Sequence, residues 1–271
     1  IMREVKLILA EQFSYLGVAQ RIAKYSNKAL YQSHILGNLW QILSPLIQLG
    51  VYYFAFGIAL GGARTVKGGV SYIAWLMVGL STWIFLSTVT KQASSSVYMQ
   101  VGMVSRMKFP ISILPMVKIF SELPSYFAFT TLAAIVSIST GEKISIYWIQ
   151  LPYYIVAMII FLYSFSLINS TIAALIRDYQ IFLNSIIQVL MYMSGVFWDL
   201  STKNLPSWLS KILMLNPYAY IINGFRDTFF YKRWFFEDKP QLVVFWLTTL
   251  VIFIVGAHLH VKFRSKFVDY M

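Results

Sequence analysis

The chain has 271 residues, a mean hydropathy of +0.66 and a formal net charge of +12. Charged residues make up only 12% of it, about half of the quarter that soluble domains usually carry. This composition excludes an ordinary water-soluble domain and predicts an all-α integral membrane protein. Cysteine is absent, which excludes disulfides and thiol catalysis. The positive charge suits anionic lipid headgroups or an anionic cargo, and loops retained in the cytoplasm account for part of it.

Residues 1–38 predict a basic amphipathic helix ahead of the first membrane span. At 100° per residue one arc is apolar or aromatic and a second arc is cationic. The apolar arc holds Tyr15, Val18, Ala19, Ile22, Tyr25 and Ala29, and the cationic arc holds Arg21, Lys24 and Lys28. Helices of this kind lie in the headgroup plane of a membrane, which is the location we expect here. The alternative is a solvated helix packed on a soluble domain, and the sequence offers no such domain.

Six stretches are predicted to cross the bilayer, each needing about 20 mostly apolar residues. They lie at about 39–60, 71–90, 119–140, within 144–176, at 179–198 and at 241–259. The fourth region holds 33 residues without a charge, which is too long for one upright span and too short for two. We expect one helix there, with an interfacial lead-in and a break near Pro152.

The distribution of lysine and arginine predicts that both termini are cytoplasmic, because cytoplasmic loops are enriched in these residues. With the N-terminus inside, the cytoplasmic flanks carry 12 of them and the short external loops carry 3. The segment 200–239 adds six outside, but long loops count less. The predicted division is therefore a cytoplasmic interfacial helix (1–38), a transmembrane domain (39–262) and a cytoplasmic tail (263–271).

The cytoplasmic loop KQASSSVYMQVGMVSRMKFP at 91–110 predicts a short helix at about 94–106. Val97, Val101 and Val104 share one helical face, and Phe109-Pro110 stops the pattern. Two interpretations remain open. The helix docks its apolar face into a groove of a partner, or it rests on the membrane surface. The cations that follow it are Arg106 and Lys108.

The third predicted span contains prolines 110, 115 and 124 and two charges on one face, Lys118 and Glu122. Ionisable residues inside a span are functional candidates, and the i,i+4 spacing permits an ion pair. The alternative is that both side chains reach the cytoplasmic headgroups from the end of the helix.

Aromatic residues lie in the middle of the first two spans. They are Tyr52, Tyr53 and Phe56 in the first span, and Trp75 and Trp83 in the second. Tyrosine and tryptophan need a hydrogen-bond partner, so these rings are candidates for a substrate path; ordinary helix packing is the alternative.

The segment at about 200–235 predicts two short helices, LPSWLSKILML and NPYAYIINGFRDTFF, between the fifth and sixth spans. Asn216 suits an N-cap and Pro217 the first helical position. Tyr218, Ile221, Ile222, Phe225 and Phe229 then recur at helical spacing. The adjacent Arg226 and Asp227 prevent a full crossing, so we predict a re-entrant hairpin that enters the outer leaflet and returns.

Catalytic, metal and nucleotide motifs are not apparent. His258 and His260 form an H-x-H pair without cysteine or clustered carboxylates, so no metal site is predicted. The glycines and lysine of GGARTVKGG (61–69) lack the spacing of a phosphate-binding loop. The chain therefore has no predicted cofactor of its own. A membrane-embedded transferase would need clustered histidines or acidic residues, and an ion-coupled carrier would need an internal repeat. The sequence shows neither feature.

The combined features resemble the ABC-2 type permeases of polysaccharide exporters. The resemblance is carried by SRMKFPISILP (105–115), IRDYQ (176–180), LNPY (215–218), N-P-x-x-x-x-I-x-G-F-R-D (216–227) and HLHVKFRSKFVD (258–269). It extends over nearly the whole chain, and among the branches it is greatest for the teichoic acid translocation permeases. Capsular polysaccharide and O-antigen exporters are the alternative within the family; a drug or lipid exporter is a more distant one.

The resemblance implies a bacterial cell-membrane complex of two permease copies and two copies of a separate ATP-binding subunit. ATP and Mg²⁺ would bind to that subunit, and nucleic acid has no role. Closure of the ATP-binding subunits would reach the permease through the helix at about 94–106. The cargo would be a polymer on an undecaprenyl pyrophosphate carrier, with wall teichoic acid as the first expectation. A pyrophosphate cannot cross hydrocarbon unaided, which agrees with a cation-bearing, aromatic path.

Overall fold

The computed structural model describes the chain except for residues 33–34, 60–64, 105–108, 177, 201–205 and 268–271. Within the described residues the regular structure is helical, apart from one β-bridge between Thr65 and Ser71. The longer helices are α1 (Met2–Gln32), α2 (Trp40–Tyr52), α3 (Tyr72–Val104), α4 (Leu114–Ser139), α5 (Leu151–Leu175), α6 (Tyr179–Met193), α7 (Ser207–Met214), α8 (Pro217–Arg226) and α9 (Lys239–Phe263).

In the part of the chain that the structure describes, four helices are long and apolar enough to cross a bilayer. With their short 3₁₀ extensions they run over Tyr72–Gln100, Ile111–Ser139, Ile146–Leu175 and Lys239–Phe267. Two more apolar helices are shorter, at Ile42–Ala55 and Tyr179–Met193. The chain is therefore an all-helical, multi-pass membrane protein, and the count of six spans stays a prediction.

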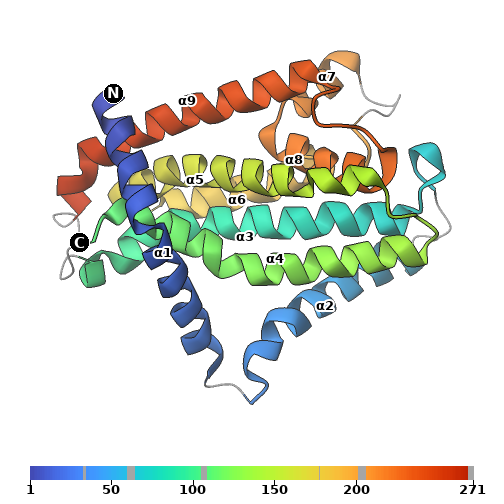
Figure 1. The fold of residues 1–271 in the computed structure, drawn as a ribbon, viewed down its shortest axis with the longest axis horizontal. Coiled ribbons are helices and arrows are strands. Elements are labelled where there is room, and N and C mark those ends of the chain that lie inside the picture. Colours follow the sequence, from blue (N-terminus) through green and yellow to red (C-terminus); the bar gives the residue numbers. More distant parts are fainter. Residues whose placement is uncertain (33–34, 60–64, 105–108, 177, 201–205, 268–271) are drawn as a thin grey trace.

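Helix α3 is the centre of the bundle, with α4 and α5 packed along it (Figure 1). Its side chains from Ala74 to Trp83 are buried on all sides. Small polar residues make this possible, because their hydroxyls donate back to carbonyls of the same helix. Ser81, Thr82 and Thr90 each do so. Small residues also let neighbouring helices approach closely in a membrane.

The predicted break near Pro152 is confirmed. A 3₁₀ turn, η5 (Ile146–Gln150), leads into α5, and Pro152 lies in the first turn of that helix. Proline is tolerated there because the missing N–H has no helical partner to lose. The buried Gln150 links this turn to the segment before α9: its Nε2 donates to Arg233 O at 2.6 Å and its Oε1 accepts from Phe235 N at 2.9 Å.

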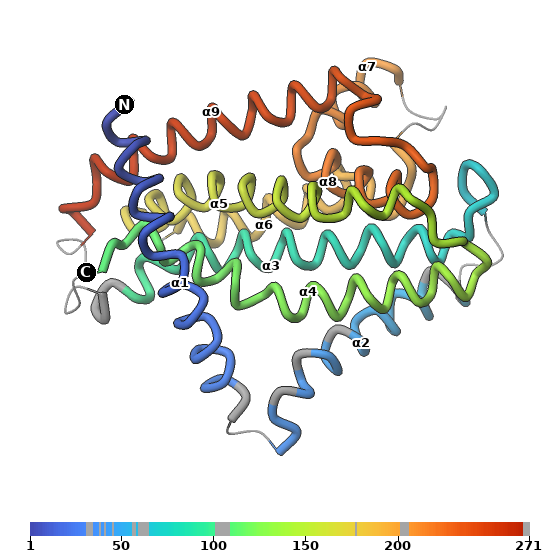
Figure 2. Tube along the Cα trace, in the orientation of Figure 1, coloured from blue at the N-terminus to red at the C-terminus, as the bar shows by residue number. Residues whose placement is uncertain are grey.

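The bundle has two distinct ends. We call the end where α1 crosses the start of α4 and the end of α9 the junction end, and the end where α7 lies the hairpin end (Figure 1). The first turn of α1 and the last turns of α9 lie together at the junction end. The second half of α1 then leaves the bundle, and α2 returns toward it along α4 (Figure 2).

The prediction of a separate short helix at about 94–106 is wrong. Residues up to Val104 continue α3 without interruption, so one helix of 33 residues serves as both span and loop. The reason is that no glycine or proline lies between residues 80 and 101, and the serines at 94, 95 and 96 bond to carbonyls one turn earlier instead of breaking the helix.

Candidate coupling junction and hairpin anchor

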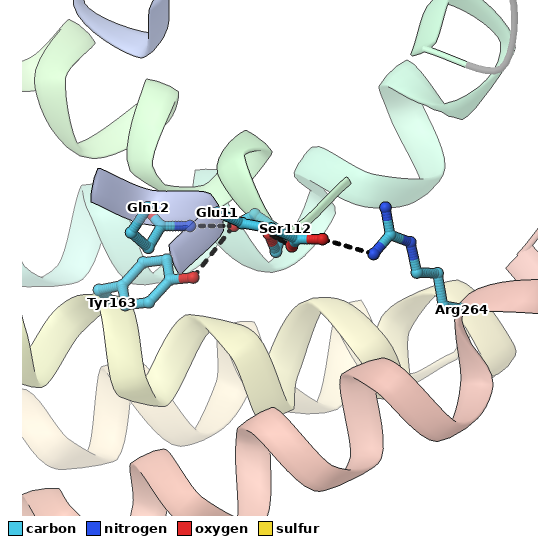
Figure 3. A network of polar contacts seen from close by, with 5 residues as sticks. All are labelled: Glu11, Gln12, Ser112, Tyr163 and Arg264. Carbon is cyan, nitrogen blue, oxygen red and sulfur yellow. Dashed lines mark hydrogen bonds and ion pairs between the residues drawn. The ribbon is translucent and has the colours of Figure 1, made fainter. Parts of the chain in front are cut away.

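Five residues from four segments form a polar network at the junction end (Figure 3). Gln12 Nε2 on α1 and Tyr163 Oη on α5 both donate to the carbonyl of Ser112, at 3.1 and 3.2 Å. Ser112 belongs to the 3₁₀ turn η4 (Ile111–Ile113), which precedes α4. Arg264 Nη1, just after α9, donates to Glu11 Oε1 at 2.6 Å, and the Ser112 hydroxyl donates to Glu11 Oε2. The network therefore fixes α1 to the start of α4 and to the end of α9.

A second contact joins the first turn of α1 to α9. His258 Nδ1 donates to Glu4 Oε2 over 2.7 Å. This hydrogen bond lowers the pKa of Glu4 below its usual value, so the carboxylate is charged at neutral pH. Glu4 and Glu11 are two turns apart, and the residues that they contact, His258 and Arg264, are spaced similarly. The first half of α1 therefore lies along the C-terminal end of α9.

Val97 is fully buried near the end of α3. It packs with Leu114, Ala174 and Phe267, which come from α4, α5 and the turn η7 (Arg264–Phe267). The burial of Val97 differs from the predicted docking face of valines, because the start of α4 and the chain after α9 cover this side chain at the end of α3. The side chains of Val101 and Val104, and the whole of Arg106 and Lys108, lie outside the described residues.

Arg226 anchors the hairpin to the bundle. Its side chain is 1% exposed, and its guanidinium carbon lies 3.3 Å from the centre of a ring of Trp75. Nη1 donates to Gly195 O at 2.7 Å, Nη2 to Val196 O at 2.8 Å and Nε to Trp75 O at 3.4 Å. Three carbonyls and one aromatic face thus replace the water around this cation. Gly79 lies against the guanidinium, since a Cβ there would be 2.9 Å from Cζ.

Helix α8 runs antiparallel to α3 and reaches deep into the bundle. At its C-terminal end Arg226 contacts Trp75, whereas at its start the ring of Tyr218 lies 5.8 Å from that of Trp83. The Tyr218 hydroxyl is 3.0 Å from Thr90 Oγ1. The predicted cap is confirmed: Asn216 Oδ1 accepts from Tyr218 N at 3.0 Å, and its Nδ2 donates to Ser194. Pro217 is the first helical residue, as predicted.

The predicted apolar face of this hairpin is also confirmed. All five of its residues are buried: Tyr218, Ile221, Ile222, Phe225 and Phe229. They face α3, α5 and α9, so the segment is a packed part of the bundle. After α8 the chain continues as a π-helix, η6 (Asp227–Tyr231), and turns away at Lys232, which has the left-handed φ of 53°.

The two tryptophans predicted to line a substrate path are enclosed within the single chain. Trp75 is 2% exposed and Trp83 is 4% exposed. Trp75 packs against Arg226 and Trp83 against Tyr218. The structure therefore corrects the earlier expectation: these rings hold α8 against α3 and are covered by protein on every side.

The aromatic residues of α2 are placed differently. The ring of Tyr52 lies 6.2 Å from that of Phe197, and Tyr53 is 41% exposed. Phe56 belongs to the π-helix η2 (Tyr53–Ala59), and its side chain lies outside the description. Val51 on α2 and Phe54 on η2 are also exposed, at 61% and 62%. One side of α2 is therefore uncovered in the isolated chain.

Lys118 and Glu122 both lie on α4 and are half-buried. Glu122 Oε1 accepts a hydrogen bond of 2.7 Å from Gln92 Nε2 on α3. The carboxylate thus points toward α3, and its contact joins two neighbouring helices near the junction end.

A small polar cavity of about 130 Å³ lies at the hairpin end. Both residues of the Arg226-Asp227 pair line it, together with Lys67, Asp199, Met214, Asn223, Tyr231, Arg233, Asp238 and Gln241. Burial raises the pKa of Asp227 to about 6, and the Arg233 guanidinium opposes the rise. Among the described residues, no group of three or more histidine, cysteine or acidic side chains forms a metal site.

The network residues Glu11, Gln12 and Ser112 were missed by the sequence analysis. Their contacts join residues about 100 or more positions apart, and no periodic pattern records such a pairing. Arg264 lies inside one of the segments that carried the family resemblance, which was the available signal for this end of the chain.

The fold is that of a multi-pass membrane protein, with α1 fixed across one end of an apolar bundle and a hairpin anchored by Arg226 near the other. The chain belongs to the ABC-2 type transporter family, whose sequence pattern matches residues 18–230. Permeases of this family are the membrane subunits of ATP-driven transporters.

Similar proteins are permeases of about the same length. The chain is 23% identical over 243 residues to the O-antigen export system permease protein RfbA of Klebsiella pneumoniae, covering 89% of this chain and 90% of that one. It is 21% identical over 262 residues to RfbA of Myxococcus xanthus, covering 97% and 98%. It is 22% identical over 236 residues to the inner membrane transport permease YadH of Escherichia coli (strain K12), covering 83% and 88%.

Proposed function

We propose that this chain is the permease subunit of an ATP-driven exporter that moves a lipid-linked polysaccharide of the O-antigen or capsular class across the bacterial cell membrane. The observation that carries the proposal is the similarity to O-antigen export permeases along nearly the whole chain. The first expectation, wall teichoic acid, rests on short motif resemblances alone. We therefore take the polysaccharide alternative as the proposed function.

The proposed complex contains two copies of this chain and two copies of a separate ATP-binding subunit, which supplies ATP and Mg²⁺. The uncovered apolar sides of α2 and α6 support a second copy. Each of these apolar residues is more than half exposed: Val51 on α2, Phe54 on the adjoining η2, and Ile181, Phe182 and Val189 on α6. A path between two copies would run along these faces, where Tyr52, Tyr53 and Phe56 are its aromatic candidates. Lys118 and Glu122 would then lie behind the path, between α4 and α3.

The proposed orientation places the junction end in the cytoplasm and the hairpin end outside. It follows from the lysine and arginine distribution, with α2 and α6 counted as spans to give six. In this orientation the start of α8 is the deep end of the predicted re-entrant hairpin, and α8 runs back from there toward the outside, where Arg226 lies. Its buried face supports this arrangement, because irregular backbone at membrane depth needs protein around it.

The proposed docking site for the ATP-binding subunit is the junction end. The end of α3 and the chain after α9 meet there, and α1 crosses beside them (Figure 1). Val101, Val104, Arg106 and Lys108 remain the predicted contact residues, whereas Val97 supports them from within. A push on this end would reach α1, α4 and α9 together through the network of Figure 3.

Surface display in cells tests the proposed cargo. The gene is deleted in its own host, and the polysaccharide and teichoic acid on the cell surface are measured separately. We expect a loss of surface polysaccharide with accumulation of the lipid-linked form inside, restored by the intact gene. An unchanged polysaccharide together with lost teichoic acid would contradict the proposal and restore the first expectation.

A further inference from the structure

A groove of about 430 Å³ separates the second half of α1 from α4. It lies between residues 20–28 of α1 and 120–127 of α4, beyond the α1 residues clamped by the network of Figure 3. Its volume falls in the range of about 300–1,000 Å³ that is usual for small-molecule sites. The two walls come from different helices and differ in chemistry.

The α1 wall is cationic. Lys24 and Lys28 line the groove and are exposed. They are four residues apart and so lie on one face of the helix. No acidic residue follows Glu11 on α1, so nothing on the same helix neutralises the pair. This wall favours an anion.

The α4 wall is apolar. Phe120, Leu123 and Phe127 line it at helical spacing, and Phe127 is 49% exposed. The same exposed stripe continues along α4 toward the hairpin end through Ile135 and Ile138, which are 57% and 45% exposed. A hydrocarbon chain that enters the groove can therefore lie along α4 beyond it.

One side-chain contact joins the two walls of the groove, and one backbone carbonyl provides a hydrogen-bond acceptor. Asn27 Nδ2 donates to Ser121 O at 2.7 Å and joins the two walls. Pro124 lacks an N–H, so it cannot supply the helical hydrogen bond to the carbonyl of Phe120. A carbonyl acceptor beside two cations suits a headgroup that carries a phosphate and a donor.

We propose that this groove binds one anionic phospholipid of the surrounding bilayer. The phosphate lies between Lys24 and Lys28, and one acyl chain packs against Phe120, Leu123 and Phe127. Free phosphate would use only the cationic wall, and a neutral lipid only the apolar one. The bound lipid fills the gap between α1 and α4, so it adds to the Asn27 contact in holding the second half of α1 in place. This inference is independent of the exported cargo.

Native mass spectrometry of the full-length chain tests the proposal. The protein in detergent is given equal amounts of phosphatidylglycerol and phosphatidylcholine, with inorganic phosphate alone in a second arm. The test variant is Lys24→Gln/Lys28→Gln. The matched control is Arg3→Gln/Lys6→Gln, which removes two exposed cations from the clamped half of the same helix.

We expect the wild-type chain and the control to retain one phosphatidylglycerol. The test variant should bind it about thirtyfold more weakly, as expected for the loss of two cations beside an anionic lipid. Equal weakening in the control, or equal retention of both lipids by the wild type, would overturn the proposal. Displacement by a polyprenyl pyrophosphate would assign the groove to the carrier lipid instead. If inorganic phosphate bound with the same affinity as phosphatidylglycerol, the groove would be an anion site and not a lipid site.

A photoreactive acyl chain gives a second readout that does not depend on a folded variant. Phosphatidylglycerol with a diazirine near the headgroup end of its chain is irradiated with the wild-type chain. We expect labelling of residues 120–127 well above that of the exposed residues Leu247 and Val251 on α9. Equal labelling of both surfaces would mean ordinary bilayer contact and would contradict a site.

Discussion

The guanidinium of Arg226 lies on the face of Trp75, 3.3 Å from a ring centre, although 151 positions separate the two residues in the chain. The same side chain donates to the carbonyls of Gly195 and Val196. It therefore joins three segments: the start of α3, the link after α6 and the end of α8. This contact explains how a hairpin with a charged pair stays inside an apolar bundle.

Loss of Arg226 should destabilise the hairpin. Arg226→Leu removes the cation but leaves three buried carbonyls without donors, at a cost of about 2–4 kcal/mol. Arg226→Lys keeps the charge, but its single ammonium cannot replace the planar guanidinium that donates to all three carbonyls. We therefore expect this variant to recover only part of the lost stability. The measurement is thermal unfolding of the purified chain in detergent. A variant as stable as the wild type would contradict the anchor.

Gly79→Ala tests the same contact from the opposite side. The added Cβ would lie 2.9 Å from Arg226 Cζ and closer still to Nη2, so the guanidinium must move off Trp75. We expect a loss of unfolding free energy of about 1–3 kcal/mol, as for overpacking in a core. Gly50→Ala in α2 is the matched control, since nothing lies within 4 Å of its Cβ position. Equal loss in both variants would point to backbone effects alone.

Val97 and Val101 should respond differently to the same change. Val97→Asp buries a carboxylate among Leu114, Ala174 and Phe267, so we expect poor folding and low yield. Val101→Asp should leave the chain folded but uncouple ATP hydrolysis by the partner subunit from transport. The measurements are yield from the membrane, ATPase rate and flux. Unchanged flux in folded Val101→Asp would remove the coupling assignment of that residue.

The Glu11–Arg264 contact should show a modest coupling energy. Both groups are partly accessible, at 12% and 35%, so solvent screening limits the pair to about 1 kcal/mol. A double-mutant cycle with Glu11→Gln and Arg264→Gln measures this term in thermal unfolding. We also expect each single variant to lower the transport rate even where its unfolding temperature stays close to that of the wild type, because α1 and α9 would no longer move together. Additive stability effects would show that the two groups do not interact.

The raised pKa of Asp227 gives a pH dependence with a defined sign. Because burial raises the folded-state pKa to about 6 from 3.8, the protonated form is favoured on folding. This contribution to stability is present below pH 3.8 and is lost as the pH rises through about 6. Above pH 6, Asp227→Asn should therefore have a higher free energy of unfolding than the wild type, by about 3 kcal/mol at most, and this difference should vanish in acid. A constant difference across this range would contradict the shift.

Local sequence patterns predicted the helices whose starts are marked by a capping residue or a proline. Asn216-Pro217 marked the start of α8, and the spacing of its apolar residues gave the buried face. Pro152 likewise marked the lead-in to α5. These features follow from caps, proline geometry and helical periodicity, all of which act within a few residues.

Long-range packing was not predictable in the same way. The pattern of Trp75 and Trp83 fits a substrate path as well as it fits packing, and only the position of α8 decides between them. Val97 carried an apolar periodicity that fits a docking face, yet the chain after α9 covers it. Which partner covers an apolar residue depends on topology, which periodicity does not record.

Reconstituted transport tests the central claim most directly. The purified chain is placed in proteoliposomes with a lipid-linked polysaccharide, either alone or with its ATP-binding subunit, and arrival of the glycan on the opposite face is measured. We predict no ATP hydrolysis by the chain alone, and ATP-dependent translocation only when both subunits are present. Nucleotide hydrolysis by this chain alone, or translocation that persists without the ATP-binding subunit, would contradict the account.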